Sequence, residues 1–420
     1  MLKDNEIYKH LVSVPKEQEL EEFYKESSDF FGVKLVENPL SFTVKDIFNT
    51  YVFPTEMGSN TWKGHIAGNN ARVISSALQA GHRFVAKTVT SEFAVHEPTG
   101  VINPWNSEFQ AGTSSAGSAV SVFLKESDYS LVTQTAGSIS RPAAYCGVIG
   151  VKPSFGLLPR TGVLKTCDSF DTVGFMALET KNLSKIFDDL RVHGKNYPYS
   201  SIVDEYYIEN KGRFNTGTTN PIRVARIDNN FDKSIAFSDD SIKTLGNACH
   251  ILRENQCEVI ESVQWPDFIH EIRDSHEQIY SRSLLYYFKT EVNNSKKISD
   301  SFKSIIKKGE SVTANTFVDL IKKNLINIKK FDEFMKENKI DFIVCPTVHG
   351  CAPKIGKNEK PDFNLIWTYL HLPTVTLPLG MSKMNKLPVG ITLVGRKYSD
   401  KSLFQMVDNF FSGVVNSFIS

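Results

Sequence analysis

Apolar and polar positions follow two different periods along this chain, and the changes of period outline its elements. Residues 1–30 place apolar side chains at helical spacing among many Glu and Lys residues, which predicts surface helices. From about residue 40, FTVKDIF (42–48) predicts a strand, and NARVISSALQAGHRFVAKT (70–88) predicts a helix followed by a strand. SAVSVFLKESD (118–128) then predicts a buried helix, and YSLVTQT (129–135) a strand. Helices alternating with short apolar strands indicate an α/β fold.

The middle of the chain differs in composition and in the spacing of its apolar residues. Residues 192–335 are rich in Lys, Asn, Ile and Phe, poor in Gly, and carry long helical patterns. Strand patterns return in IDFIVCPTV (340–348), PTVTLPLG (373–380) and LPVGITLVG (387–395). Because these late strands need partners, we expect one domain over 1–420, with N-terminal helices in 1–38 and a mostly helical insertion over 192–335.

Composition narrows the class of protein. The 420 residues are 41% hydrophobic and 23% charged with a net charge of +1, which favours a soluble globular protein and gives no support for a nucleic-acid partner. The charged N-terminus lacks the apolar core of a secretory signal, and no apolar run approaches a membrane span. The six cysteines form no CxxC pair and no zinc-type cluster. We therefore expect a cytoplasmic enzyme with mostly buried, reduced thiols, no metal and no membrane contact.

The stretch AGTSSAGSAVSVF (111–123) concentrates small and hydroxyl residues directly before a buried helix. It is not a phosphate-binding P-loop, because Ala119 and Val120 stand where Lys and Ser or Thr are required. It is not a linker either, because an apolar run follows at once. The remaining interpretation is a loop that leads into the N-terminus of a helix. Backbone amides and the helix dipole favour negative charge there.

A second loop of this kind, QTAGSISRPAAYCG (134–147), places Ser138 at the end of a strand. The two loops together indicate serine chemistry with backbone amides as an oxyanion hole. No histidine has a recognisable motif context as the base. Lys45, inside the apolar strand pattern, is a better candidate, because burial lowers the pKa of a lysine. A solvated lysine on a strand is the alternative.

Several segments in a fixed order resemble the amidase signature hydrolases: GTSSAGSAV (112–120), QTAGSISRPAAYCGVIGVKPSFGLLPRTGV (134–163) and SFDTVGFMA (169–177). The resemblance extends upstream through FTVKDIFNT, AKTVTSEFA and NPWN, and downstream through DFIVCPT, APKIG, LPTVTLP and LPVGITLVGRKYSD. It is strong over about 40–180, recognisable over about 340–402 and absent between them. It implies a single domain built on a large, mixed, twisted β-sheet covered by helices.

The resemblance also implies a Ser–cis-Ser–Lys triad, whose motif positions fall on Ser138, Ser114 and Lys45. Ser138 would form the acyl-enzyme, Ser114 would relay its proton, and neutral Lys45 would be the base. A cis peptide bond would join Thr113 to Ser114. The oxyanion donors would be backbone amides of Thr135, Ala136, Gly137 and Ser138.

Two neighbours of the nucleophile depart from the family. Gln134 and Ser140 stand where the family commonly has Asp and Arg. We expect the two to face each other and to fill the space with a hydrogen bond or a water. Arg141, one residue later, is a candidate for part of the missing arginine's role.

The residues that contact substrate are the least readable. Thr113, Ser115, His371 and Trp367 are candidates, and the 192–335 insertion is expected to shape the pocket. Ser115 could instead cap the helix, and His371, where the family often has Gly, could be a packed histidine. Cys146 lies in an apolar run that favours a packed thiol, and Asp171 is expected to fix a turn.

These features favour a serine amidohydrolase that cleaves a carboxamide C–N bond of a small molecule through an acyl-enzyme, without a cofactor. A homodimer is left open. One alternative is the ammonia-releasing glutaminase component of an amidotransferase, and another is acyl transfer to an amine acceptor. The third alternative is a non-catalytic binding scaffold, against which the complete set of triad residues argues.

Overall fold

The computed structural model describes residues 5–31, 36–95, 99–193, 197–211, 221–229, 231, 235–294 and 296–419. Its strands, in chain order, are β1 (Leu11–Ser13), β2 (Ser41–Lys45), β3 (Arg83–Thr88), β4 (Tyr129–Gln134), β5 (Ile149–Lys152), β6 (Thr172–Ala177), β7 (Arg223–Arg226), β8 (Glu258–Ile260), β9 (Phe342–Pro346), β10 (Thr374–Met381) and β11 (Pro388–Gly395). The strands predicted near residues 42, 83, 129, 342, 374 and 388 are confirmed.

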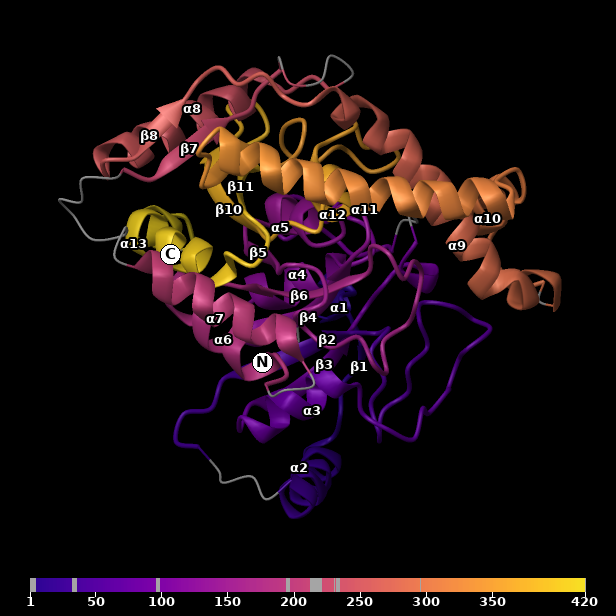
Figure 1. Cartoon of the computed structure of the whole chain (residues 1–420). Coiled ribbons are helices and arrows are strands. Elements are labelled where there is room, and N and C mark those ends of the chain that lie inside the picture. The colour runs from indigo at the N-terminus through magenta and orange to yellow at the C-terminus, as the bar shows by residue number, and fades with distance from the viewer. Residues whose placement is uncertain are drawn as a thin grey trace.

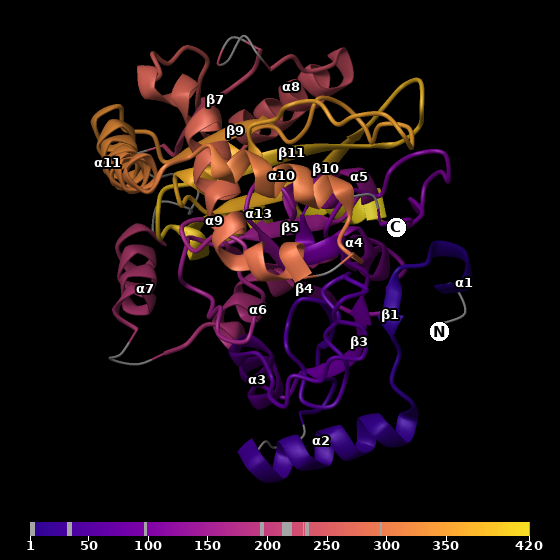
Figure 2. The ribbon, with the colours of Figure 1, turned by 90° about the vertical axis from the view of Figure 1, so that its right-hand side faces the viewer.

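The helices are α1 (Asn5–Tyr8), α2 (Glu17–Phe31), α3 (Arg72–Gln79), α4 (Ala116–Phe123), α5 (Ser140–Cys146), α6 (Leu183–Leu190), α7 (Pro198–Asn210), α8 (Asp239–Glu254), α9 (Ile272–Asn294), α10 (Asp300–Glu310), α11 (Ala314–Glu337), α12 (Asn364–Tyr369) and α13 (Asp400–Ile419). Short 3₁₀ helices cover Glu92–Ala94, Thr180–Asn182 and Asp267–Glu271. Figure 2 shows α2 as a separate layer beyond α3, at the end of the molecule that the N-terminal half occupies.

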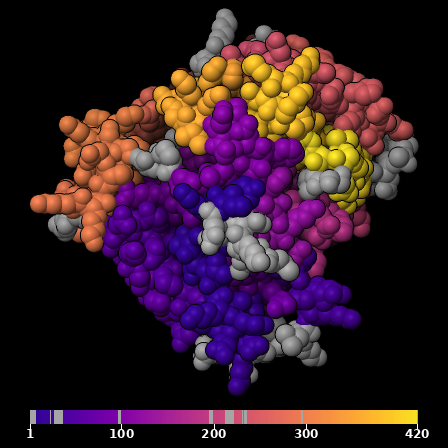
Figure 3. Space-filling model, turned by 180° about the vertical axis from the view of Figure 1, so that it is seen from behind, coloured from indigo at the N-terminus to yellow at the C-terminus, as the bar shows by residue number. Residues whose placement is uncertain are grey.

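All eleven of these strands belong to one mixed sheet, in the order β1-β3-β2-β4-β6-β5-β10-β11-β9-β7-β8, with helices on both faces (Figure 1). The antiparallel pairing of β5 with β10 joins the N-terminal half of the sheet to the C-terminal half. In the view of Figure 3 the N-terminal segments accordingly lie below and the orange and yellow C-terminal segments above. The predicted single α/β domain with a large mixed sheet is confirmed.

The alternation of side chains along the strands decides what each face of the sheet carries. Phe42 and Val44 of β2 are fully buried in the main core cluster, which α3, α6, α8 and α13 complete. Thr43 and Lys45 therefore point to the other face, where Thr43 Oγ1 lies 3.4 Å from Ser121 Oγ of α4. The helices α4 and α5 form a second, smaller cluster on that face. This alternation turns Lys45 toward the serine-rich loops.

Two segments for which helices were expected also contribute short strands to the edges of the sheet. Residues 1–38, for which N-terminal helices were predicted, contain α1 and α2 and also β1, which pairs with β3, with Leu11 opposite Thr88. Residues 192–335 contain α7 to α11, and their β7 and β8 extend the sheet beyond β9. A sheet edge presents unpaired N–H and C=O groups, so a short strand from a neighbouring segment gains hydrogen bonds by adding to it.

Two sequence-based expectations concern the environment of side chains. All six cysteines are free, and all but the half-buried Cys351 are buried, as predicted. Burial raises the pKa of the Cys146 thiol, which lies 3.4 Å from Ala111 O, so the packed-thiol interpretation holds.

Among the residues described, no helix is both long and apolar enough to cross a membrane.

Candidate active site

The side chain of Lys45 lies at the end of β2 and is fully buried. Its Nζ donates a hydrogen bond of 3.0 Å to Ser114 Oγ, which joins two of the three predicted triad residues. Burial lowers the pKa of Lys45 to about 7, although the charge of Asp171 partly offsets the effect. A substantial fraction of Lys45 is therefore neutral near pH 7, the form that can accept a proton.

The loop that carries Ser114 depends on Gly112. Gly112 has a φ of +109°, and a Cβ added there would lie 2.5 Å from Pro142 Cβ on α5. The missing side chain thus allows the loop to pass directly against the helix that follows Ser138. This close approach explains why position 112 is a glycine.

The predicted cis bond between Thr113 and Ser114 is wrong for this structure, because the peptide bonds of the described residues are all trans. The cis form of a non-proline bond is less stable than the trans form by roughly 3–4 kcal/mol. The trans loop already brings Ser114 Oγ to Lys45 Nζ, so that contact does not need the cis form.

The turn Thr135–Ser138 joins β4 to α5 and contains the proposed nucleophile. Ser138 is partly exposed, and within the described chain its hydroxyl makes no hydrogen bond, so the expected Ser114–Ser138 relay contact is not formed here. The backbone amides of Thr135, Ala136, Gly137 and Ser138 likewise have no partner among the described residues. Four consecutive donors thus stand free beside a free hydroxyl.

The paired departure from the family pattern behaves as expected. Gln134 Oε1 lies 3.4 Å from Ser140 Oγ, so the two side chains face each other. The same oxygen accepts hydrogen bonds from the amides of Ile139 (2.8 Å) and Ser140 (3.0 Å). A neutral amide therefore occupies the space behind Ser138 and caps the first amides of α5.

Arg141 does not turn toward Gln134. Its guanidinium pairs with Asp362 (2.9 Å) and Glu359 (2.6 Å), on the segment before α12. Burial by itself would lower the pKa of Arg141, but the two carboxylates outweigh it and raise the pKa. Arg141 therefore ties the start of α5 to α12 and does not replace the missing arginine beside residue 134.

Asp171 fixes a turn, as predicted. Its carboxylate accepts hydrogen bonds from the amides of Thr166 (2.8 Å) and Cys167 (2.9 Å). It also accepts one of 2.6 Å from Thr135 Oγ1, which couples this turn to the Thr135–Ser138 turn.

The four candidate substrate contacts occupy different environments. Thr113 is buried beside Ser114. Ser115 stands at the N-cap of α4, but its buried hydroxyl makes no capping bond and has no partner in the part of the chain described. Trp367 is fully buried among aromatic rings, including Phe231 and Phe363. That packing makes Trp367 a core side chain.

His371 is packed. Its ring stacks on Phe155 with 4.1 Å between ring centroids, and its Nε2 lies 2.7 Å from Ser169 O. Burial lowers the pKa of His371 to about 3, so the ring is neutral near pH 7. The histidine also lines a cavity of ≈ 480 Å³ with residues such as Arg396 and Lys397. The geometry supports the packed-histidine alternative, and contact with a substrate stays a prediction.

Sequence reasoning missed two residues that touch the Thr135–Ser138 turn. His276 of α9 places its Nε2 2.8 Å from Thr135 O, and Thr368 of α12 donates a 3.0 Å hydrogen bond to Ala136 O. His276 lies outside the segments that carry the resemblance to the family, and no motif singles it out. Only a contact across 141 residues reveals it.

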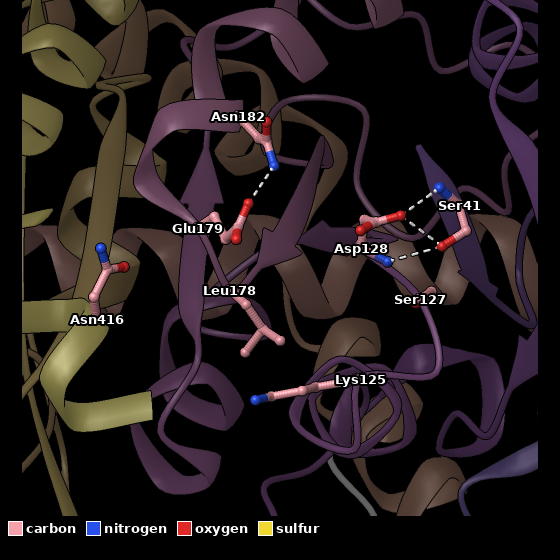
Figure 4. Close-up of a pocket in the computed structure, with 8 residues that line it drawn as sticks. All are labelled: Ser41, Lys125, Ser127, Asp128, Leu178, Glu179, Asn182 and Asn416. Carbon is pink, nitrogen blue, oxygen red and sulfur yellow. Dashed lines mark hydrogen bonds between the residues drawn. The ribbon is translucent and has the colours of Figure 1, made fainter. Parts of the chain in front are cut away.

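Another hollow, of ≈ 390 Å³, opens at the other end of β2, where Ser41 lies (Figure 4). Asp128 accepts hydrogen bonds there from the amide (2.6 Å) and the hydroxyl (2.7 Å) of Ser41. Because β2 separates Ser41 from Lys45 by four residues in an extended strand, this hollow is distinct from the candidate active site. Within the described ranges, no group of three or more His, Cys, Asp or Glu side chains could hold a metal ion.

Several known proteins are similar to this chain over most of its length. A curated glutamyl-tRNA(Gln) amidotransferase component of Prochlorococcus marinus (strain NATL2A) is 28% identical over 411 residues, covering 87% of this chain and 82% of that protein. The structure of 6-aminohexanoate cyclic dimer hydrolase complexed with substrate shares the fold, with a TM-score of 0.81, 17% identity, and coverage of 100% of this chain and 93% of that one.

A further solved structure, a glutamyl-tRNA(Gln) amidotransferase component from Thermotoga maritima, has a TM-score of 0.70 and 21% identity, covering 93% of this chain and 91% of that one. The family model described as Amidase matches residues 28–404, which include β2, both serine-rich loops and the late strands. With the fold and the motif order in agreement over most of its length, this chain belongs to the amidase signature family.

Proposed function

We propose that this protein is a serine amidohydrolase that cleaves the C–N bond of a small carboxamide through an acyl-enzyme on Ser138. The observation that carries the proposal is the buried Lys45, hydrogen-bonded to Ser114 Oγ at 3.0 Å and partly neutral near pH 7. A base of this kind, next to a hydroxyl relay, is what a serine nucleophile requires.

In the proposed reaction Ser138 Oγ attacks the amide carbonyl. Its proton passes through Ser114 to Lys45, and the oxyanion that forms is bound by the free amides of the Thr135–Ser138 turn. Lys45 then returns a proton through Ser114 to the leaving nitrogen. Water completes the cycle by attacking the acyl-enzyme. The Ser114–Ser138 contact is expected to tighten when substrate binds, because catalytic hydrogen bonds are often longer in unliganded enzymes.

Covalent labelling tests the nucleophile. A fluorophosphonate should add to Ser138 of the wild-type protein, with loss of fluoride and an increase in mass that mass spectrometry detects. Ser138→Ala should fold and stay unlabelled. Ser130→Ala is the matched control, because its buried hydroxyl on β4 has no partner among the described residues and its loss should leave labelling intact. Labelling of Ser138→Ala at the wild-type rate would reject the assignment.

A second candidate is the glutaminase component of an amidotransferase. It is favoured by the curated relatives that match over most of both chains, which are named as components of glutamyl-tRNA(Gln) amidotransferase. A coupled ammonia assay with glutamine and a panel of aliphatic and aromatic carboxamides separates the two. Preference for glutamine would favour this candidate, and preference for another carboxamide the first one. If the protein neither turns over any of these amides nor becomes labelled, the result would favour the non-catalytic binding scaffold.

A further inference from the structure

We propose that His276, on α9 of the 192–335 insertion, is a positioning residue that aims the oxyanion-binding amides of the Thr135–Ser138 turn, with Thr368 of α12 as its companion. The inference rests on the proposed function. It adds a residue that the family motifs do not supply and gives the insertion a part in the reaction.

The geometry of the peptide group connects His276 to the amides. In a planar trans peptide unit the carbonyl of one residue and the N–H of the next point in opposite directions. His276 Nε2 lies 2.8 Å from Thr135 O, so its hydrogen bond directs the Ala136 N–H away from α9. Thr368 Oγ1 lies 3.0 Å from Ala136 O and directs the Gly137 N–H in the same way.

Most of the other polar groups around the turn already have hydrogen-bond partners. Gly137 O accepts a 3.0 Å hydrogen bond from the amide of Arg141. Gln134 Oε1 accepts hydrogen bonds from the amides of Ile139 and Ser140. The carboxylate of Asp171 accepts one from Thr135 Oγ1. The donors of this turn that have no partner in the described structure are the amides of residues 135–138 and the hydroxyl of Ser138. The amides are the groups that an oxyanion on the attacked carbonyl would need.

The imidazole of His276 is itself held firmly. It is 4% exposed, and its ring stacks on Phe170 with 4.6 Å between centroids and 12° between planes. Burial lowers the pKa of His276 to about 4, so the ring is neutral near pH 7 and has one N–H. The carbonyl of Thr135 can only accept, which places that N–H on Nε2.

Thr368 is the weaker of the two supports. Its hydroxyl accepts a 3.1 Å hydrogen bond from Gln134 Nε2, so its own proton faces the carbonyls. That proton is shared, because Asn364 O lies at 3.1 Å, nearly as close as Ala136 O. The Thr135 carbonyl, held by a single imidazole donor, is therefore the contact to test.

The experiment measures fluorophosphonate labelling of the full chain as a function of probe concentration, which separates the limiting rate kinact from the half-saturating concentration KI. The aimed amides act mainly on the charge that develops as the bond forms. His276→Phe, which keeps an aromatic ring against Phe170 but cannot donate, should therefore lower kinact on the order of 10- to 100-fold with little change in KI. His276→Gln can donate from nearly the same place and should recover most of kinact.

Two further variants separate positioning from folding. His276→Leu also lacks a donor and replaces the phenylalanine variant if that one does not fold. His82→Phe removes another buried imidazole, hydrogen-bonded to Tyr129 Oη and Asp189, and should lower the urea midpoint while leaving kinact unchanged.

The outcomes are distinct. Absence of labelling in the wild-type protein would overturn the proposed function and the inference with it. If the wild type is labelled and both His276→Phe and His276→Leu keep kinact within threefold of it, the inference is overturned but the proposed function is not. Equal losses in the glutamine and phenylalanine variants, or a change confined to KI, would also overturn the inference, because they would indicate a structural role or a direct contact with the probe.

Discussion

At the scale of single residues, burial changes the chemistry of Lys45. A lysine in water keeps its proton until about pH 10.4, and a protonated amine cannot act as a base. In this fold the side chain is fully buried with one hydroxyl partner, Ser114, and its pKa falls to about 7. Strand alternation, which turns Lys45 away from the Phe42–Val44 face, creates that environment.

The rate of labelling or turnover should therefore rise with pH as Lys45 loses its proton. Because the pKa is lowered, the neutral base becomes dominant above about pH 7, so the logarithm of the rate should rise with unit slope below that pH and level off above it. Lys45→Arg is the matched variant, since a guanidinium stays protonated and should give almost no labelling at any pH from 6 to 9. A wild-type rate that is flat over this range, with chemistry limiting, would contradict a lysine base.

At the scale of elements, the site depends on how closely two loop–helix units approach each other. The loop before α4 passes against α5 at Gly112, where even one added carbon would overlap Pro142. The contact holds Ser114 on the same side of the sheet as the Thr135–Ser138 turn. The close approach to Pro142 accounts for the glycine at position 112.

Gly112→Ala should be costly for this reason. Any L-residue is strained at a φ of +109°, and overpacking adds about 1–3 kcal/mol to that strain. The matched control is Gly156→Ala, where φ is +84° and nothing lies within 4 Å of the added carbon. Urea unfolding should show a clearly larger loss for Gly112→Ala, accompanied by slower labelling. Equal losses for the two variants would mean that the contact with Pro142 relaxes without cost.

At the scale of the whole molecule, buried contacts of His10 hold the N-terminal segment against α4. His10 Nε2 lies 2.6 Å from Glu126 Oε2, and both side chains are at most 2% exposed. His10 O accepts a hydrogen bond from Val89 N, and Gly117 of α4 leaves no room for a side chain against it. The chain thus closes over α4 with contacts between residues more than a hundred positions apart.

Breaking this buried pair should destabilise the protein strongly. His10→Leu leaves Glu126 buried without its partner, which costs on the order of 3–5 kcal/mol, whereas His10→Leu with Glu126→Leu should recover much of the loss. The exposed pair His250–Glu254, 3.2 Å apart, is the control, and His250→Leu should change the free energy of unfolding by about 0.5 kcal/mol or less. Additive losses at His10 and Glu126 in urea unfolding would show that the pair is not coupled.

The local pattern of the sequence determined a large part of this description. Alternation over FTVKDIF located β2 and the face that carries Lys45, and the two serine-rich stretches located both loops. These features could be predicted because periodicity and turn composition act within a few residues. The pairing of Gln134 with Ser140 was expected from the resemblance to the family, which commonly has Asp and Arg at these positions, and not from the local pattern.

Tertiary structure alone decided the rest. His276 and Thr368 reach the Thr135–Ser138 turn across 141 and 232 residues, and nothing in their local pattern marks them. The strands β7 and β8 are short segments that become strands because β9 offers an edge to pair with. Such contacts depend on which distant surfaces meet in the folded chain, and this information is spread over the entire sequence instead of residing in any one stretch.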